Sequence, residues 1–309
     1  VAVTGQVPVA MIGKDAFQES DIIGMANPVV KYAFQPRLPG EVPEAVRKGF
    51  YIAETGRPGP VLIDVPKDVQ QNEAPMDFPD EFKIQGYHPW NDPDIGSVEK
   101  AIDMLLNSEK PIILAGGGTI ISSAFAELQS IAETLMLPVV TTFKGKGAFP
   151  ENHPLSLGPI GMHGHAEANK MMAEADCVLA IGTRFSDRSV GTFEAFEKRL
   201  KIIHMDVDPA EIGKNQTTSV AVVGDVRASL RIMVKLLLQR AVKKTEDSLW
   251  IKHVRETKEY WKENLKLHPG EMGAAKILRK LRELLPKESV VTTEVGQHQM
   301  WASLFYDVI

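Results

Sequence analysis

Two short apolar runs in the middle of the chain constrain its fold more than any other feature. Residues 177–181 read CVLAI and lead into Gly182-Thr183, and residues 202–207 read IIHMDV and end among acidic residues. Continuous apolar runs of this length are typical of strands that are buried on both faces of a parallel sheet. Glycine and aspartate at strand ends suit the carboxyl edge of an open α/β sheet, where ligands bind. We therefore expect a sheet with binding residues along one edge.

A regular alternation of strands and helices is predicted around those two runs. Five apolar runs are expected to form strands, at residues 111–115, 139–142, 177–181, 202–207 and 220–223. Helical periodicity predicts helices at residues 98–107, 122–136, 166–175 and 226–240. Such alternation is typical of a parallel sheet with helices on its faces. Residues 98–243 are therefore predicted to form a central, doubly wound α/β domain.

Partial α/β domains are predicted on both sides of the central one. Residues 1–80 contain an expected helix (43–55) and a buried strand (61–65), and residues 81–97 form a linker rich in Pro, Asn, Asp and Gly. Residues 244–270 are a predicted linker helix, and residues 271–309 hold a helix (273–285), a strand (289–293) and the start of a further helix. Because the chain lacks an initiator Met and stops soon after that strand, we interpret it as an internal fragment of a longer polypeptide.

The composition argues against several classes of protein. A net charge of −5 gives no sign of a nucleic-acid partner, and no apolar run is long enough to span a bilayer. The single cysteine, Cys177, excludes a disulfide framework, so we expect a cytoplasmic protein. Cys177 lies inside an apolar run, and we interpret it as a buried small hydrophobe rather than a catalytic thiol.

Two glycine-containing motifs follow predicted strands. Gly116-Gly117-Gly118 would let a phosphate or sugar approach the backbone, but a plain tight turn explains these residues as well, and the GxGxxG fingerprint is absent. Residues 182–188 read GTRFSDR, in which Arg188 could hold a carboxylate or phosphate through two parallel hydrogen bonds. The alternative is an ordinary surface ion pair between Asp187 and Arg188.

Three further motifs lie at predicted loops or strand ends. Asp206 and Asp225 are interpreted as acceptors for ribose or ribitol hydroxyls, with helix capping as the alternative, whereas Asp208 before Pro209 is interpreted as a cap. The loop GMHGH at 161–165 has no partner spaced for zinc, so a loop over a ligand is favoured over a metal site. Residues 294–298, EVGQH, could present backbone N–H groups to a diphosphate or cap a helix.

Taken together, these segments resemble one enzyme family. They are TGQVP, IGKDAFQE, RPGPVLIDVPKD, GMHG, GTRFSDR, MDVDPAEIGKN and VGQHQMW. Their order and spacing, over nearly the whole chain, resemble the catalytic large subunit of acetohydroxyacid synthase (acetolactate synthase), a thiamine-diphosphate enzyme. The resemblance implies that residues 1–80 are the C-terminal part of a pyrimidine-binding domain, 98–243 an FAD-binding domain and 271–309 the start of a diphosphate-binding domain.

The resemblance also implies an activity, cofactors and partners. The reaction would join two pyruvates, or pyruvate and 2-ketobutyrate, with loss of CO2, in branched-chain amino-acid biosynthesis. The implied cofactors are thiamine diphosphate, Mg²⁺ and an FAD that passes no electrons. The implied partners are small 2-ketoacids, further copies in a homodimer or higher oligomer, and a regulatory small subunit, with no nucleic acid and no membrane.

The site residues are carried over by the same resemblance. Gln6 would act at the reacting centre, and Arg188 would hold the carboxylate of the second ketoacid. The substrate channel would be lined by Pro8, Phe17, Lys67, Met162 and Asp187. FAD would contact Arg57, Gly116, Gly117, Thr142, His163, Gly182, Thr183, Arg184, Asp206 and Asp225. Thiamine diphosphate would contact Val295, Gly296, Gln297 and His298.

Two parts of the family pattern are not found in the sequence. In the family the catalytic glutamate lies upstream of the position of Val1, and the Gly-Asp-Gly metal motif lies downstream of that of Ile309. The fragment itself is therefore expected to be inactive, with the Mg²⁺ ligands outside it. The alternatives are another thiamine-diphosphate enzyme on the same scaffold, such as glyoxylate carboligase or a pyruvate oxidase, and a non-catalytic module that binds a flavin or adenine nucleotide.

Overall fold

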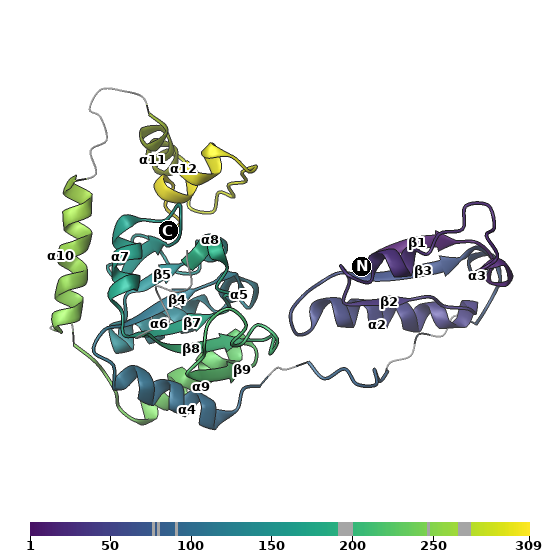
Figure 1. The fold of residues 1–309 in the computed structure, drawn as a ribbon, viewed down its shortest axis with the longest axis horizontal. Coiled ribbons are helices and arrows are strands. Elements are labelled where there is room, and N and C mark those ends of the chain that lie inside the picture. Colours follow the sequence, from purple (N-terminus) through teal and green to yellow (C-terminus); the bar gives the residue numbers. More distant parts are fainter. Residues whose placement is uncertain (76–77, 79–80, 90–91, 191–199, 246–247, 265–272) are drawn as a thin grey trace. The chain divides into compact units, whose positions relative to one another are not determined.

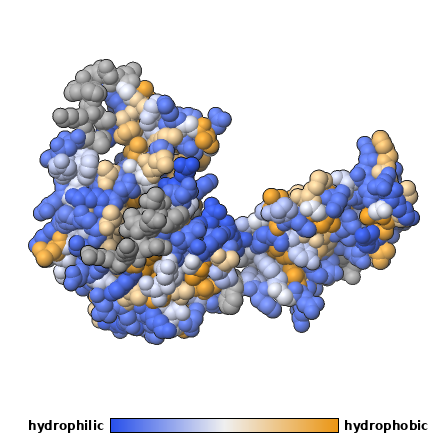
Figure 2. Space-filling view, viewed as in Figure 1, coloured by the Kyte–Doolittle hydropathy of each residue, from blue (hydrophilic) through white to orange (hydrophobic). Residues whose placement is uncertain are grey.

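The computed structural model describes residues 1–309 except 76–77, 79–80, 90–91, 191–199, 246–247 and 265–272 (Figure 1). The chain divides into two compact units, Val1–Pro89 and Trp90–Ile309. Polar and apolar side chains are mixed over the visible face of both units (Figure 2). Among the described residues, every helix is too short or too polar to traverse a membrane. The two units are taken in turn below.

The first unit is built on a three-stranded parallel sheet in the order β1-β3-β2 (Figure 1). The strands are β1 (Ala2–Gln6), β2 (Tyr32–Phe34) and β3 (Val61–Pro66). Helix α2 (Val42–Glu54) packs Ala45 against Ile63 and Val65 of the central strand β3, which is buried along its whole length. The remaining elements are short: η1 (Val9–Met11), α1 (Ile22–Ala26), η2 (Pro39–Glu41) and α3 (Lys67–Gln71).

The second unit is built on a six-stranded parallel sheet in the order β6-β5-β4-β7-β8-β9. Its strands are β4 (Pro111–Ala115), β5 (Val139–Thr141), β6 (Ser156–Pro159), β7 (Cys177–Ile181), β8 (Lys201–Asp206) and β9 (Val220–Val223). The strand pairs of this sheet, in the described part of the chain, are all parallel. The predicted α/β class with parallel sheets is therefore confirmed.

Alternate residues of each strand face opposite sides of this sheet, and helices cover both sides. Ile113 and Leu179 pack with α4 (Ile95–Leu106), α6 (Phe125–Leu135) and α9 (Val226–Gln239), whereas Ile112 and Val178 pack with α7 (Ala166–Glu174) and α10 (Leu249–Asn264). Burial on both faces explains why these strands read as continuous apolar runs. Short helical segments α5 (Gly117–Ile121), η3 (Phe143–Gly145) and α8 (Asp187–Val190) follow β4, β5 and β7.

The C-terminal residues of the second unit form a helix pair, α11 (Ala274–Leu284) and α12 (Gln297–Phe305). Arg282 Nη1 donates to the Tyr306 hydroxyl at 3.1 Å, which ties the pair together. Hydrogen bonds from the α12 end of the chain connect this pair to the rest of the unit. His165 Nε2 lies 3.2 Å from the Leu304 carbonyl oxygen, and Val308 N donates to Glu151 Oε2 at 2.7 Å.

Several predicted elements differ from those observed. The helix predicted at 122–136 begins later, as α6 at Phe125, because Ser123 adopts a left-handed conformation (φ +53°) that is incompatible with a helix. The preceding helix α5 was not predicted. The strand predicted at 289–293 is wrong: these residues are irregular, and the described residues offer them no neighbouring strand to pair with. Strands β2 and β6 were not predicted. The domain boundaries inside the chain remain predictions.

Candidate functional site

The backbones that follow β4 and β7 cross in direct contact at the carboxyl edge of the six-stranded sheet. Gly116 N donates to Ile181 O at 2.7 Å, and Gly118 N donates to Gly182 O at 3.0 Å. A Cβ on Gly116 would lie 2.2 Å from Gly182 O, and one on Gly182 would lie 2.5 Å from Gly118 Cα. Gly182 also needs a positive φ of +56°. Only glycine allows the two segments to approach this closely.

This crossing lies where the winding of the sheet reverses. The chain leaves β4 toward β5 on one side and leaves β7 toward β8 on the other, while β4 and β7 are neighbours. In open α/β sheets, ligands bind outside the carboxyl ends of the strands at such a switch point. The predicted residues Gly116, Gly117 and Gly182 are therefore brought together at the position that this rule favours for a ligand.

Hydroxyl and carboxylate groups follow the neighbouring strands at the same edge. Thr142 lies after β5, and its hydroxyl accepts a hydrogen bond from Gly145 N at 3.0 Å. Asp206 ends β8, is 8% exposed, and accepts from Asp208 N at 2.9 Å, while its carbonyl accepts from Gly224 N at 3.0 Å. The sheet thus aligns the predicted residues of β4, β5, β7 and β8 along one edge.

Asp225 and Asp208, two further aspartates near this edge, differ in whether they cap a helix. Asp225 precedes α9 and accepts from Ala228 N at 2.8 Å, so it caps that helix; its predicted ligand role remains a prediction. The prediction that Asp208 caps a helix is wrong. Its carboxylate accepts from Ala210 N at 3.0 Å, but the residues that follow form turns, because the chain there runs GKNQTTS and lacks an apolar helical face.

A buried histidine that the sequence reading missed supports the loop after β7. His204 on β8 donates from Nε2 to the Thr183 carbonyl at 2.8 Å and packs edge-on against Phe185, with ring centroids 5.2 Å apart. Its Nδ1 is buried without a hydrogen-bond partner. Burial lowers the pKa of His204 below its usual value, so the ring is neutral. A histidine inside an otherwise apolar strand was the available signal.

Arg188 and the predicted channel residues Asp187 and Met162 lie together where α8 meets the loop after β6. Arg188 Nε lies 3.6 Å from Asp187 Oδ2, and Nη1 lies 3.9 Å from Met162 Sδ. α8 and the loop after β6 also meet through the backbone, where Met162 N donates to Arg188 O at 3.3 Å. The Arg188 side chain is 74% exposed, so its pair with Asp187 contributes little to stability and leaves the guanidinium accessible. His163 lies on the same loop as Met162 and is also exposed.

The two histidines of residues 161–165 belong to no metal-binding group among the described residues. His165 lies 3.5 Å from Glu167 Oε1 through Nδ1 and contacts the Leu304 carbonyl through Nε2. Within the described ranges, no group of three His, Cys, Asp or Glu side chains is placed to hold a metal ion.

In the first unit, Gln6 lies at the end of β1 within a polar network. Its Nε2 donates to Ser20 O at 2.7 Å and to Asp64 Oδ2 at 3.2 Å. Pro8 follows β1, and Lys67 begins α3 directly after β3, so both lie at the same carboxyl edge as Gln6. Phe17 is 90% exposed on the loop before α1. Arg57 is exposed after α2, in the unit that does not contain the glycine crossing.

The four residues predicted for thiamine diphosphate lie at the start of α12. Gly296 is the N-cap residue, Val295 precedes it, and Gln297 and His298 form the first turn. Gln297, His298 and Val295 are exposed. A helix N-terminus with exposed backbone N–H groups suits an anion.

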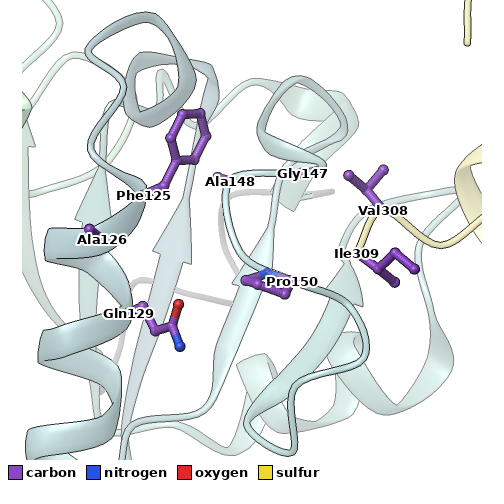
Figure 3. Close-up of a pocket in the computed structure, with 8 residues that line it drawn as sticks. All are labelled: Phe125, Ala126, Gln129, Gly147, Ala148, Pro150, Val308 and Ile309. Carbon is purple, nitrogen blue, oxygen red and sulfur yellow. The ribbon is translucent and has the colours of Figure 1, made fainter. Parts of the chain in front are cut away.

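The predicted residues line neither of two pockets found among the described residues. A cavity of ≈340 Å³ in the second unit lies between the start of α6, the loop after η3 and the chain end (Figure 3). Its lining comprises Phe125, Ala126, Gln129, Gly147, Ala148, Pro150, Val308 and Ile309. A second pocket of ≈720 Å³ in the first unit lies against α2 and the end of β3, with Val42, Val46 and Val65 in its lining.

Comparison with known proteins shows which proteins this chain is similar to. Residues 98–233 match the family described as "Thiamine pyrophosphate enzyme, central domain". The chain is 43% identical over 315 residues to a "Probable acetolactate synthase large subunit" of Methanocaldococcus jannaschii, covering 99% of this chain and 53% of that protein. It is 42% identical to an "Acetolactate synthase large subunit" of Parasynechococcus marenigrum, over 98% of this chain and 49% of that protein. A large subunit of the same name from Corynebacterium glutamicum is 39% identical, over 99% and 49%. The chain thus spans about half the length of these curated relatives.

Proposed function

We propose that the protein of this chain is a thiamine-diphosphate-dependent acetolactate synthase, because the chain is similar to acetolactate synthase large subunits and matches a thiamine pyrophosphate enzyme central domain. The proposed reaction joins two pyruvates, or pyruvate and 2-ketobutyrate, with loss of CO2. The products are 2-acetohydroxyacids for branched-chain amino-acid biosynthesis. The observation that carries the proposal is the 43% identity over 99% of the chain.

The carboxyl edge of the six-stranded sheet supports a flavin nucleotide as one ligand. At the crossing of Gly116 and Gly182, the absence of side chains lets the segments after β4 and β7 meet at the switch point of the sheet, where a ligand is expected. The carboxylates of Asp206 and Asp225 can accept hydrogen bonds from ribose and ribitol hydroxyls. Arg184 is exposed at the same edge and can pair with a diphosphate. Predicted contacts from Gly117, Thr142, His163 and Thr183 extend the same row, and Arg57 of the first unit remains a predicted contact.

The exposed cluster of Met162, Asp187 and Arg188 supports recognition of a ketoacid. The Arg188 guanidinium has a planar array of donors that matches a carboxylate. Asp187 Oδ2 and Met162 Sδ lie 3.6 Å and 3.9 Å from the nearest nitrogen atoms of this side chain. We propose that Arg188 binds the carboxylate of the second ketoacid. Gln6, Pro8, Phe17 and Lys67 of the first unit remain predicted residues of the reacting centre and channel.

Residues 295–298 support a diphosphate at the start of α12. Their backbone N–H groups lie at or before the N-terminus of that helix, where the helix dipole favours negative charge. Thiamine diphosphate, when bound, supplies the electron sink that decarboxylation requires. The proposed Mg²⁺ has no predicted ligand among the residues of this chain. Assembly as a homodimer or higher oligomer with a regulatory small subunit is part of the same proposal.

The proposal is tested by carboligation in the whole protein. Incubation with pyruvate, thiamine diphosphate, Mg²⁺ and FAD is expected to release CO2 and form acetolactate. Tartronate semialdehyde from glyoxylate, or oxidation of pyruvate to acetate or acetyl phosphate without carboligation, would instead favour another enzyme on this scaffold. Equal affinity for ADP and FAD, without turnover of any ketoacid, would favour a nucleotide-binding module.

A further inference from the structure

One carboxylate organises the loop between η1 and α1 in the first unit. Glu19 Oε1 accepts from Gly13 N, and Glu19 Oε2 accepts from Ala16 N at 3.0 Å and from Lys14 N at 3.3 Å. Hydrogen bonds from these backbone N–H groups lower the pKa of Glu19, and the bond from Gly13 has the largest effect. Charge-assisted hydrogen bonds of this kind are stronger than neutral ones. The side chain of Glu19 thus gathers the backbone of residues 13–16 around itself.

The backbone of this loop needs such support because part of it is strained. Asp15 (φ +54°) and Gln18 (φ +66°) adopt left-handed conformations, as does Gly13 (φ +78°). For a residue with a Cβ, this conformation costs free energy, so it persists only where surrounding interactions hold it. In this loop, the donors of the three hydrogen bonds to Glu19 lie on both sides of Asp15 in the sequence, and Gln18 directly precedes Glu19.

The held loop presents a large apolar side chain. Phe17 is 90% exposed, and it lies between Ala16 and Gln18 at the turn that Glu19 N closes with a 2.9 Å hydrogen bond to Ala16 O. Exposed aromatic side chains on rigid backbone are suited to contact a ligand or partner, because little entropy is lost on binding. Phe17 is also one of the residues that the proposed function places in the substrate channel.

The base of the loop is fastened to the sheet by Gln6. Gln6 Nε2 donates to Ser20 O, directly after Glu19, and also to the Asp64 carboxylate. Asp64 is fully buried and accepts further hydrogen bonds from Thr4 Oγ1 at 2.9 Å and Gln35 Nε2 at 2.8 Å. A continuous set of hydrogen bonds therefore runs from the sheet, through Gln6, to the residue next to Glu19.

We propose that Glu19 is a positioning residue that folds residues 13–19 and thereby holds Phe17 in place for contact with the ketoacid. The contact between Phe17 and the ketoacid rests on the proposed function, whereas the folding of the loop by Glu19 does not. Glu19 itself does not contact the substrate and acts only through Phe17. Glu19 is therefore expected to affect the affinity and specificity for the substrate and not the rate of the chemical step.

The first experiment measures hydrogen exchange at the amides of Gly13, Lys14 and Ala16 in the whole protein. Glu19→Ala is expected to speed exchange at these three amides by about tenfold or more, because their acceptor is gone. Glu19→Gln keeps one acceptor oxygen and should give a smaller increase. Asp21→Ala is the matched control, since Asp21 accepts from Gly24 N at 2.9 Å and not from the loop. Unchanged exchange in Glu19→Ala would overturn the proposal.

The second experiment is a double-mutant cycle on the KM for pyruvate. Phe17→Ala and Glu19→Ala are each expected to raise KM by about 5- to 20-fold with kcat nearly unchanged, as for lost binding that is equal in ground and transition states. The double variant should have the KM of Phe17→Ala alone, because Glu19 acts through Phe17. Effects that multiply would overturn the proposal. A wild-type protein without carboligation would overturn the proposed function, while the exchange rates would still decide the role of Glu19 in the loop.

Discussion

At the scale of single residues, the exposed guanidinium of Arg188 is the group whose substitution tests ketoacid binding most directly. Replacing Arg188 with Ala is expected to raise the KM for the second ketoacid by about 10- to 100-fold, because charged hydrogen bonds to a carboxylate contribute roughly 1.5–3 kcal/mol. Lysine keeps the charge but loses the planar pair of donors, so Arg188→Lys should recover only part of the affinity. Steady-state kinetics with pyruvate and 2-ketobutyrate measure this. An unchanged KM in both variants would contradict the assignment.

The buried His204 predicts how the stability of the second unit depends on pH. Burial lowers the pKa of His204 below its ordinary 6.5, so the unfolded chain binds a proton that the folded chain excludes. The free energy of unfolding should therefore fall as pH drops below 6.5 toward the folded-state pKa, by up to about 1.4 kcal/mol per pH unit. Carboxylates such as Glu133, whose pKa is lowered from 4.5 by the hydrogen bond from Gln129, lose their contribution only at lower pH.

Urea unfolding between pH 7 and pH 5 measures this effect, with His204→Gln as the comparison. The glutamine amide can still donate to the Thr183 carbonyl, but it does not titrate. The variant should lose less stability than the wild type over this interval. Parallel pH profiles for the two proteins would show that His204 is not responsible.

Residues at strand ends were accessible to sequence reasoning, whereas those with distant partners were not. Gly116, Gly182 and Asp206 could be placed at one sheet edge, because a strand in a parallel sheet delivers its C-terminal residues there. The role of His204 depends on a carbonyl 21 positions away, and that of Asp64 on three amide or hydroxyl groups from other segments. Such partners are determined by tertiary packing, which local pattern does not specify.

At the scale of elements, strands with apolar residues on both faces were predicted well, and irregular ones were missed. β4 and β7 have the predicted bounds, because burial on both faces gives an uninterrupted apolar run. β9 also has its predicted bounds, although it is an edge strand in which Ala221 is exposed. β6 is four residues, SLGP, with a glycine at φ +78° and a proline, and its pairing with β5 is irregular. Neither residue is typical of a strand, so its position at the edge of the sheet could not be seen beforehand.

Because the segments after β4 and β7 cross in direct contact, a single methyl group added at Gly182 is expected to destabilise the fold strongly. Gly182→Ala adds a Cβ 2.5 Å from Gly118 Cα at a backbone φ of +56°. Conformational strain and overpacking together should lower the free energy of unfolding by roughly 3 kcal/mol or more. Gly213→Ala is the control, since its φ is +72° but its nearest neighbour is Thr218 Oγ1 at 3.9 Å. That variant should lose only about 1–2 kcal/mol. Equal losses in urea unfolding would mean that the crossing relaxes easily.

At the scale of the whole molecule, the two units predict a selective response to ligand. The proposed flavin edge belongs to the second unit, apart from Arg57. Saturation with FAD at about 100 times its Kd should stabilise that unit by about 2.7 kcal/mol, which raises its Tm by roughly 5–10 °C. The first unit should unfold at an unchanged temperature unless its Arg57 also contacts the nucleotide.

Calorimetry combined with hydrogen exchange separates these cases. With FAD, slower exchange is expected in the loops after β4, β7 and β8, and residues 56–58 report whether Arg57 takes part. Asp206→Asn should reduce the shift in Tm, because an amide is a weaker acceptor for sugar hydroxyls than a carboxylate. ADP serves as the ligand control, since it lacks the ribitol and ring. An FAD-dependent shift confined to the first unit, or an equal shift with ADP, would be incompatible with a flavin lying along the six-stranded sheet.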